Sequence, residues 1–193
     1  MKVEENALVL DFLPRGKSAS YKPEPVAQVI GMDYFTLLEI VPKEGVEFKA
    51  MEKVYVGKGE RDKVEYIKRR IKFSELTSNA LSEIEKTIES LIKGNEKKYV
   101  DFFNNASPIT IKRHQIELLP GLGKKHVFSI LEQREKEHFK SFEDISKRVK
   151  LMPNVVNTLV KRIVEELESE EEKHYIFARP PSHGEDRPRE FRK

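Results

Sequence analysis

Short apolar runs separated by turn residues occupy the first third of the chain. The runs are rich in β-branched and aromatic residues and fall at residues 6–12, 26–30, 34–41, 46–56 and 64–73. Runs of this length and composition predict β-strands. Residues 14–25, between the first two runs, are polar and basic and predict a mobile loop. The number and spacing of the strands predict a small closed or partly closed barrel.

An OB-type barrel is our first interpretation of these strands, because such barrels present loops and one sheet face to single-stranded nucleic acid. The last predicted strand carries a basic cluster of Lys63, Lys68, Arg69, Arg70 and Lys72. Aromatic residues accompany it, as base stacking beside phosphate contacts requires: Tyr55, Tyr66 and Phe73. In the alternative interpretation the sheet is an unrelated one, acidic neighbours neutralise the charge, and the aromatic residues belong to the core.

Helical periodicity begins after residue 76. Thr77 is the predicted N-cap of a helix that reaches Lys93, and residues 96–104 predict a second, short helix. Both helices have an apolar stripe, which is typical of a helix that packs on a core. We therefore expect them to cover the barrel and to connect it to the rest of the chain.

Four further helices are predicted in the remainder of the chain. Ser107 and Pro108 open the first, over residues 107–119, and the second covers residues 124–137. A capping box at Ser141 opens the third, and an apolar stripe that ends at Leu167 marks the fourth. Helix, short turn and helix thus occur twice in succession. Pairing the two hairpins would bury the apolar sides of both in one core.

The turn between the first two of these helices has the sequence LLPGLGKK, residues 118–125. Pro120 cannot continue the preceding helix, because proline has no amide proton and its ring clashes with the turn before it. Gly121 and Gly123 have no Cβ, so the backbone can adopt positive φ or closely approach another group. Leu122, between them, is the apolar residue that can hold the turn against the core.

An anion is favoured where the second helix begins. The first amides of a helix have no partner within it, and they act together with the helix dipole and with Lys124 and Lys125. A nucleic-acid phosphate is the nearest candidate. Residues 107–162 also hold 12 basic and 6 acidic residues, whereas residues 1–106 hold 18 of each. The alternative is an ordinary helical hairpin whose glycines serve only the turn.

The second turn, residues 149–153, lacks both glycines. We therefore expect it not to bind phosphate as the first turn does.

No catalytic constellation is evident in the sequence. The absence of cysteine excludes disulfides and cysteine-ligated metal sites, the histidines are spread out, and the glycines do not match a nucleotide-binding loop. We expect a protein that is not an enzyme and has no cofactor or metal. No apolar run is long enough to span a bilayer and no signal-peptide pattern is present, which predicts a cytoplasmic protein without membrane contact.

The stretches LVLDFLPRG, KKYVDFFNNASPIT and IELLPGLGKKH resemble an archaeal family known as domain of unknown function 655. The alternation of apolar residues and glycines in the last stretch also resembles the helix-hairpin-helix motif. The family resemblance covers nearly the whole chain except its C-terminal tail. It implies an OB-like N-terminal domain, a helix-hairpin-helix C-terminal domain and a role in RNA or DNA binding, and it implies no established activity.

The expected fold class is α+β, in four parts. These are an OB-like five-stranded β-barrel (1–73), connecting or capping helices (74–106), a paired helix-hairpin-helix domain (107–176) and a disordered basic tail (177–193). The expected function is non-catalytic binding of nucleic-acid backbone phosphate, with RNA preferred and DNA possible. The alternative is a protein-interaction adaptor in a translation or DNA-processing complex. The residues expected to bind are Lys68, Arg69, Arg70, Lys72, Lys112, Arg113, Gly121, Leu122, Gly123, Lys124 and Lys125.

Overall fold

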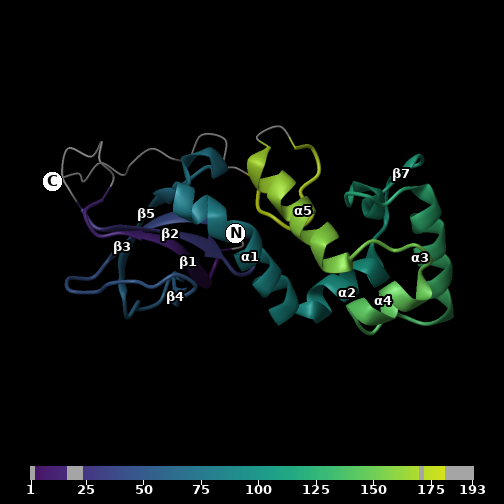
Figure 1. Ribbon diagram of the computed structural model, residues 1–193, viewed down its shortest axis with the longest axis horizontal. Coiled ribbons are helices and arrows are strands. Elements are labelled where there is room, and N and C mark those ends of the chain that lie inside the picture. Colours follow the sequence, from purple (N-terminus) through teal and green to yellow (C-terminus); the bar gives the residue numbers. More distant parts are fainter. Residues whose placement is uncertain (1–2, 17–23, 170–171, 181–193) are drawn as a thin grey trace. The chain divides into compact units, whose positions relative to one another are not determined.

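The computed structural model describes residues 3–16, 24–169 and 172–180 (Figure 1). Within these ranges the chain is mixed α+β, as predicted, with a five-stranded sheet, a two-stranded hairpin and five α-helices. It forms two compact units. The sheet unit comprises the described residues up to Thr87 and those from Glu166 onward, and the helical unit is Ile88–Glu165. Most of the predicted loop at 14–25 and most of the predicted tail at 177–193 lie outside the described residues.

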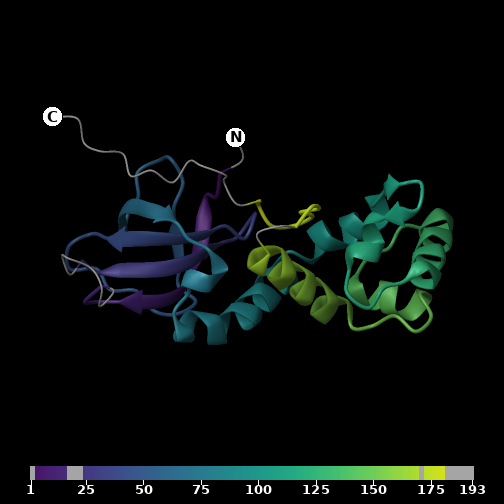
Figure 2. The same cartoon turned by 90° about the horizontal axis from the view of Figure 1, so that it is seen from above.

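The large sheet has the strand order β4-β1-β2-β3-β5, and every pairing in it is antiparallel. The strands are β1 (Asn6–Leu13), β2 (Val26–Gly31), β3 (Leu37–Pro42), β4 (Lys53–Tyr55) and β5 (Val64–Arg70). The register shifts once between β1 and β2 and twice between β3 and β5. Such irregularities increase the local twist, and the sheet curls into a half-barrel (Figure 2).

The sheet encloses an apolar core, and β2 and β3 are buried at every residue. Its buried members come from all five strands and from the segment before β4: Ala7, Val9, Ala27, Val29, Leu38, Ile40, Phe48, Val54, Val56 and Val64. The rings of Phe12 and Phe48 meet edge to face, with centroids 5.8 Å apart. The fourth predicted strand, 46–56, shortens to Lys53–Tyr55, because the chain turns at residues 49–52.

Polar side chains connect the sheet to the start of α1 (Ser78–Gly94). The side-chain nitrogen of Gln28, on β2, donates to the backbone carbonyl of Glu75 at 3.0 Å. Its side-chain oxygen accepts from the backbone amide of Thr77 at 2.8 Å. The Thr77 hydroxyl donates to Asp11 at 2.6 Å and accepts from the Ala80 amide at 3.1 Å. The second bond confirms Thr77 as the N-cap of this helix.

The helical unit continues with α2 (Glu96–Asn105), a small hairpin of β6 (Pro108–Thr110) and β7 (Arg113–His114), and the 3-10 turn η2 (Gln115–Leu118). It ends with α3 (Lys124–Lys136), α4 (Phe142–Arg148) and α5 (Val155–Glu168). Its fully buried side chains include Tyr99, Phe103, Ile116, Leu119, Ile130, Ile145, Leu159 and Ile163. The Ser141 hydroxyl accepts from the Asp144 amide at 3.1 Å, which confirms the predicted cap of α4.

The predicted helix over residues 107–119 is wrong. This segment forms the β6–β7 hairpin followed by η2. The run Ile109-Thr110-Ile111 is β-branched, and β-branched side chains favour a strand. Gln115 then closes the hairpin, since its amide donates to the Ser107 carbonyl at 3.1 Å and its side-chain oxygen accepts from the Ser107 amide at 2.8 Å.

The acidic end of α5 is partly buried. Glu166 is only 2% exposed, and its carboxylate accepts from the amides of residues 176–178 at 2.8 to 3.0 Å. Arg70 donates to the carbonyls of residues 179 and 180 at 2.6 and 2.8 Å. Residues 176–180 therefore pack within the sheet unit, and the first part of the predicted disordered tail is ordered. No helix in the described ranges is long and apolar enough to cross a membrane.

Candidate nucleic-acid interface

The turn between η2 and α3 has the conformation that its glycines allow. Gly121 has φ +84°, one of the two conformations that its lack of a Cβ was expected to allow, and a side chain there would be strained. Leu122 is 5% exposed and holds the turn against the core. Gly123 is extended, with φ −105° and ψ −177°, and is the N-cap of α3. A Cβ at Gly123 would meet no atom within 4 Å, so the approach to the helix start is open.

Two exposed lysines lie at the start of α3. Lys124 and Lys125 form no ion pair with any described residue, and the first turn of the helix contains no acidic residue. The carbonyl of Gly123 accepts from the amides of His126 and Val127, whereas the amides of the two lysines have no partner within the helix. Two amides, the positive end of the helix dipole and two cationic side chains therefore meet at one place.

His126 connects this turn to the second one. Its Nδ1 accepts from the Gly123 amide at 3.3 Å, and its Nε2 lies 3.1 Å from the carbonyl oxygen of Leu151. Because Nδ1 accepts, the neutral ring carries its proton on Nε2 and donates it to that carbonyl. The Gly123 amide is thus already satisfied, and a ligand at this helix start meets the amides of Lys124 and Lys125 instead.

The second turn resembles the first in its backbone but is not followed by lysines at the helix start. Leu151 has φ +56°, as Gly121 has a positive φ, although it is a leucine and 93% exposed. Pro153 has no amide proton, and the next helix starts at Val155 without a lysine in its first turn. Asn154 caps that helix, since its side chain accepts from the Asn157 amide at 2.9 Å. The second turn therefore offers an anion no cation in the first turn of the helix that follows it.

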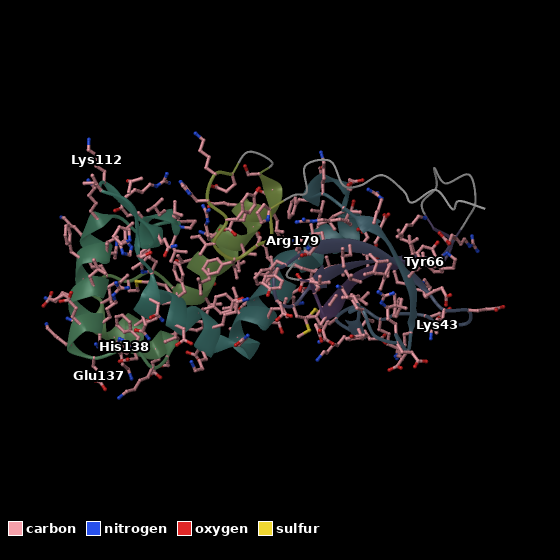
Figure 3. The ribbon with its side chains drawn as sticks, turned by 180° about the vertical axis from the view of Figure 1, so that it is seen from behind. Lys43, Tyr66, Lys112, Glu137, His138 and Arg179 are labelled. Carbon is pink, nitrogen blue, oxygen red and sulfur yellow. The ribbon has the colours of Figure 1, made fainter. Side chains whose placement is uncertain are left out.

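The β6–β7 hairpin adds cations to the first site. Lys112 and Arg113 are exposed at its tip, form no ion pair with a described residue, and share with Lys124 the wall of a pocket of about 310 Å³. Figure 3 shows Lys112 at the outer end of the hairpin, pointing away from the ribbon. The helical unit therefore brings these three predicted residues together beside Gly121, Gly123 and Lys125.

The basic cluster of β5 is mostly engaged within the protein. Lys68 pairs with Glu24 at 3.0 Å, and Arg69 pairs with Glu39 at 3.0 Å and with Glu75 at 2.6 Å. The Tyr66 hydroxyl donates to Glu24 at 2.5 Å, and this hydrogen bond raises the pKa of Tyr66 to about 12. Neutralisation by acidic residues was the alternative interpretation of this cluster, and Glu24, Glu39 and Glu75 are the carboxylates that pair with it.

Arg70 and Lys72 line a second pocket, of about 450 Å³, within the sheet unit. Three carboxylates share its wall, from Glu75, Glu166 and Glu168. The Arg70 guanidinium donates to the backbone carbonyls of residues 179 and 180. The Lys72 backbone amide donates to the Glu75 carboxylate at 2.8 Å. The mixture of charges makes this pocket a weaker attractor of phosphate than the start of α3. The described residues contain no group of three or more His, Asp or Glu side chains that could hold a metal ion.

Comparison with known proteins shows which family has this architecture. Residues 3–179 match the family described as "Protein of unknown function (DUF655)". The chain belongs to the DUF655 family. It is 41% identical over 180 residues to the uncharacterized protein MJ0038 of Methanocaldococcus jannaschii, covering 92% of this chain and 81% of that protein. It also resembles the crystal structure of Af1531 from Archaeoglobus fulgidus, a DUF655 protein. That match has 46% identity and a TM-score of 0.84, and covers 91% of this chain and all of the other.

Two exposed apolar residues beside the candidate site were not predicted from the sequence. Phe128 is 71% exposed and Ile111 is fully exposed, and both lie at the pocket beside the cations of the hairpin. A signal for Phe128 was present, because it stands four residues after Lys124 and so shares its face of the helix. The buried residues of α3 include Val127 and Ile130. Ile111 could not have been recognised, since the segment that contains it was assigned to a helix.

Proposed function

We propose that this DUF655 protein is a non-catalytic nucleic-acid-binding protein that holds backbone phosphate at the start of α3. The observation that carries the proposal is the open approach to that helix start, where exposed Lys124 and Lys125 stand beside amides without a partner in the helix. Amides at a helix start and lysine side chains are common phosphate ligands in nucleic-acid complexes. RNA is the preferred ligand, by analogy with OB-like domains of the translation apparatus, and DNA is the second choice.

The distribution of unengaged charge supports this assignment. Lys112, Arg113, Lys124 and Lys125 are exposed, form no ion pair with a described residue, and all belong to the helical unit. A cation that is already paired must break that pair before it can contact a phosphate, whereas these residues need not. Concentrated, unpaired positive charge is the feature that attracts a polyanion.

The finer architecture is part of the proposal. We propose that η2, the first turn and α3 act as one helix-hairpin-helix element, and that α4, the second turn and α5 act as its partner. The positive φ of Gly121 and of Leu151 supports this pairing. We also propose that the half-barrel is OB-like. Since β2 and β3 are buried throughout, its contribution to binding would come from loops rather than from the face of those strands.

A protein-interaction adaptor is the second candidate, and one observation favours it. Leu151 is 93% exposed at the tip of the second turn, in a backbone conformation that is unfavourable for leucine. An exposed apolar residue held in this way is suited to a protein partner. Salt dependence separates the two functions, because phosphate binding weakens steeply as salt rises and an apolar interface need not.

The test is charge reversal at the helix start. Lys124→Glu/Lys125→Glu should bind single-stranded and duplex RNA and DNA much more weakly than wild type in fluorescence anisotropy, with an unchanged melting temperature. The slope of log K against log salt should fall by about 0.7 to 0.9 for each lost phosphate contact. Lys86→Glu/Lys161→Glu is the matched control, since it makes the same change in net charge at exposed lysines of α1 and α5.

Two results would refute the proposal. One is that the Lys124→Glu/Lys125→Glu protein melts like wild type and keeps wild-type affinity and salt slope. The other is that the control variant loses affinity to the same extent, because binding would then depend on net charge and not on this turn.

A further inference from the structure

The pocket between the β6–β7 hairpin and the first turns of α3 contains apolar side chains in addition to the cations of the proposed phosphate site. It has a volume of about 310 Å³, and its wall combines cations with apolar groups. The residues that matter are Ile111, Lys112, Arg113, His114, Lys124 and Phe128. All of them belong to the helical unit, so the pocket is formed by one compact body. Glu117 is the acidic residue among those that line it.

Phe128 gives the pocket an aromatic surface that the fold itself does not use. Its side chain is 71% exposed and makes no ring contact with another described residue. It follows Lys124 by four residues, so the ring and the ammonium group share one face of α3. Ile111, fully exposed at the tip of the hairpin, is a second exposed apolar residue that lines the pocket. A flat apolar ligand with negative charge on either side fits these neighbours.

His114 lines the pocket, and its ring nitrogen Nε2 is buried behind the wall. It is 6% exposed, and its Nδ1 accepts from the Ile116 amide at 3.2 Å. The neutral ring therefore carries its proton on Nε2, and that atom has no partner among the described residues. Burial, and next to it the charge of Arg134, lowers the pKa of His114, which keeps the ring neutral at neutral pH. A buried donor without an acceptor is costly, but Nε2 is itself shielded from solvent, so a ligand in the pocket reaches it only if the residues around it move.

We propose that this pocket takes one unstacked base of a single-stranded nucleic acid, with its ring on Phe128 and its flanking phosphates on Lys112, Arg113 and Lys124. A nucleotide within a single strand supplies a flat face for Phe128 and a phosphate on each side. A duplex supplies the phosphates only, because its bases are stacked and paired. The inference rests on the proposed function and narrows its ligand to strands or loops with an unpaired base.

The absence of tryptophan from the chain permits a direct test. Phe128→Trp introduces a single indole, whose emission should be quenched by a short single-stranded uridine oligomer. It should not respond to an A·U duplex of equal length or to the same oligomer with abasic residues. Phe128→Ala should lose about 5- to 150-fold affinity for the oligomer, which corresponds to about 1–3 kcal/mol per stacked base, and should bind the duplex like wild type. Leu81→Ala, another exposed apolar position, should bind both like wild type.

The outcomes separate this inference from the proposed function. If Lys124→Glu/Lys125→Glu loses binding while Phe128→Ala binds the oligomer like wild type, the base pocket is wrong and the phosphate site stands. If charge reversal leaves binding intact, the proposed function fails, whatever Phe128→Ala does. Equal losses of oligomer and duplex affinity in Phe128→Ala, or no quenching of Phe128→Trp at saturation, would also overturn the base pocket.

Discussion

The two glycines of the first turn should respond oppositely to the same substitution. Gly121 has φ +84°, a conformation that a β-branched residue adopts only with strain. Gly121→Val should therefore lower the free energy of unfolding by about 1–3 kcal/mol. Gly123 has φ −105°, which valine tolerates, and a Cβ there meets nothing within 4 Å. Gly123→Val should cost only about 1 kcal/mol, because valine is a poorer N-cap than glycine.

The expected effects on binding are reversed. The methyl groups of Gly123→Val extend into the open approach to the amides of Lys124 and Lys125. Losing hydrogen bonds from these amides to a phosphate should cost about 1.5–3 kcal/mol, or roughly tenfold or more in affinity. Gly121→Val should bind like wild type at a temperature well below its midpoint, because it strains the turn without occupying the ligand site.

Thermal melts and filter binding on the same preparations measure both effects. A loss of 1 kcal/mol lowers the melting temperature of a chain of this size by about 2–4 °C, so Gly121→Val should melt about 2–12 °C below wild type. Gly45→Val is the matched control, since Gly45 has φ +76°, lies in the sheet unit and is also free of neighbours within 4 Å. It should show similar strain and normal binding.

The reasoning fails if Gly123→Val melts as expected and still binds RNA with wild-type affinity, because the open helix start would then not be the site. It also fails if Gly123→Val unfolds the domain while Gly121→Val is as stable as wild type.

Two further predictions concern the second turn and the buried histidine. Lys150→Glu should cost much less affinity than Lys124→Glu in parallel titrations, since the helix after Lys150 begins without a free lysine, and equal losses would show that the turns are equivalent. The lowered pKa of His114 means that the unfolded chain binds a proton more readily there, so this residue contributes stability above its ordinary pKa of 6.5 that is lost as pH falls below it. His114→Asn, which can still cap the Ile116 amide, should show a smaller decrease in melting temperature between pH 7 and pH 5 than wild type, and an unchanged decrease would contradict this assignment.

Elements with local signals could be predicted from the sequence. Thr77 and Ser141 were recognisable as caps because the amide that donates to each hydroxyl belongs to a residue three positions later in the sequence. The strands of the half-barrel were recognisable from β-branched runs between turn residues. The positive φ at Gly121 followed from the proline before it and from the helix after it.

Features that depend on distant partners could not be predicted. Arg69 was predicted to bind phosphate, but it pairs with Glu39, which lies thirty residues earlier in the sequence and on the neighbouring strand. Glu166 belongs to an acidic run, and no local feature distinguishes it from the neighbours that remain in water. Its burial depends on three amides that the chain supplies ten to twelve residues later. The helix wrongly assigned to 107–119 failed for a related reason, because Gln115 pairs with Ser107 only once the hairpin has closed.

The second turn shows why counting glycines is a poor criterion for binding. Leu151 adopts a positive φ despite its side chain, so the loss of glycine did not remove the shape of the turn. The carbonyl of Leu151 accepts from His126, whose other nitrogen holds the Gly123 amide, and this bridge gives the strained residue a fixed neighbour within the same unit. The turns differ instead in the helix that each of them precedes, because α3 begins with two exposed lysines, whereas α5 begins with Val155 after a proline and a capping asparagine. Positive charge at the helix start, rather than the shape of the turn, therefore distinguishes the turn we expect to bind from its neighbour.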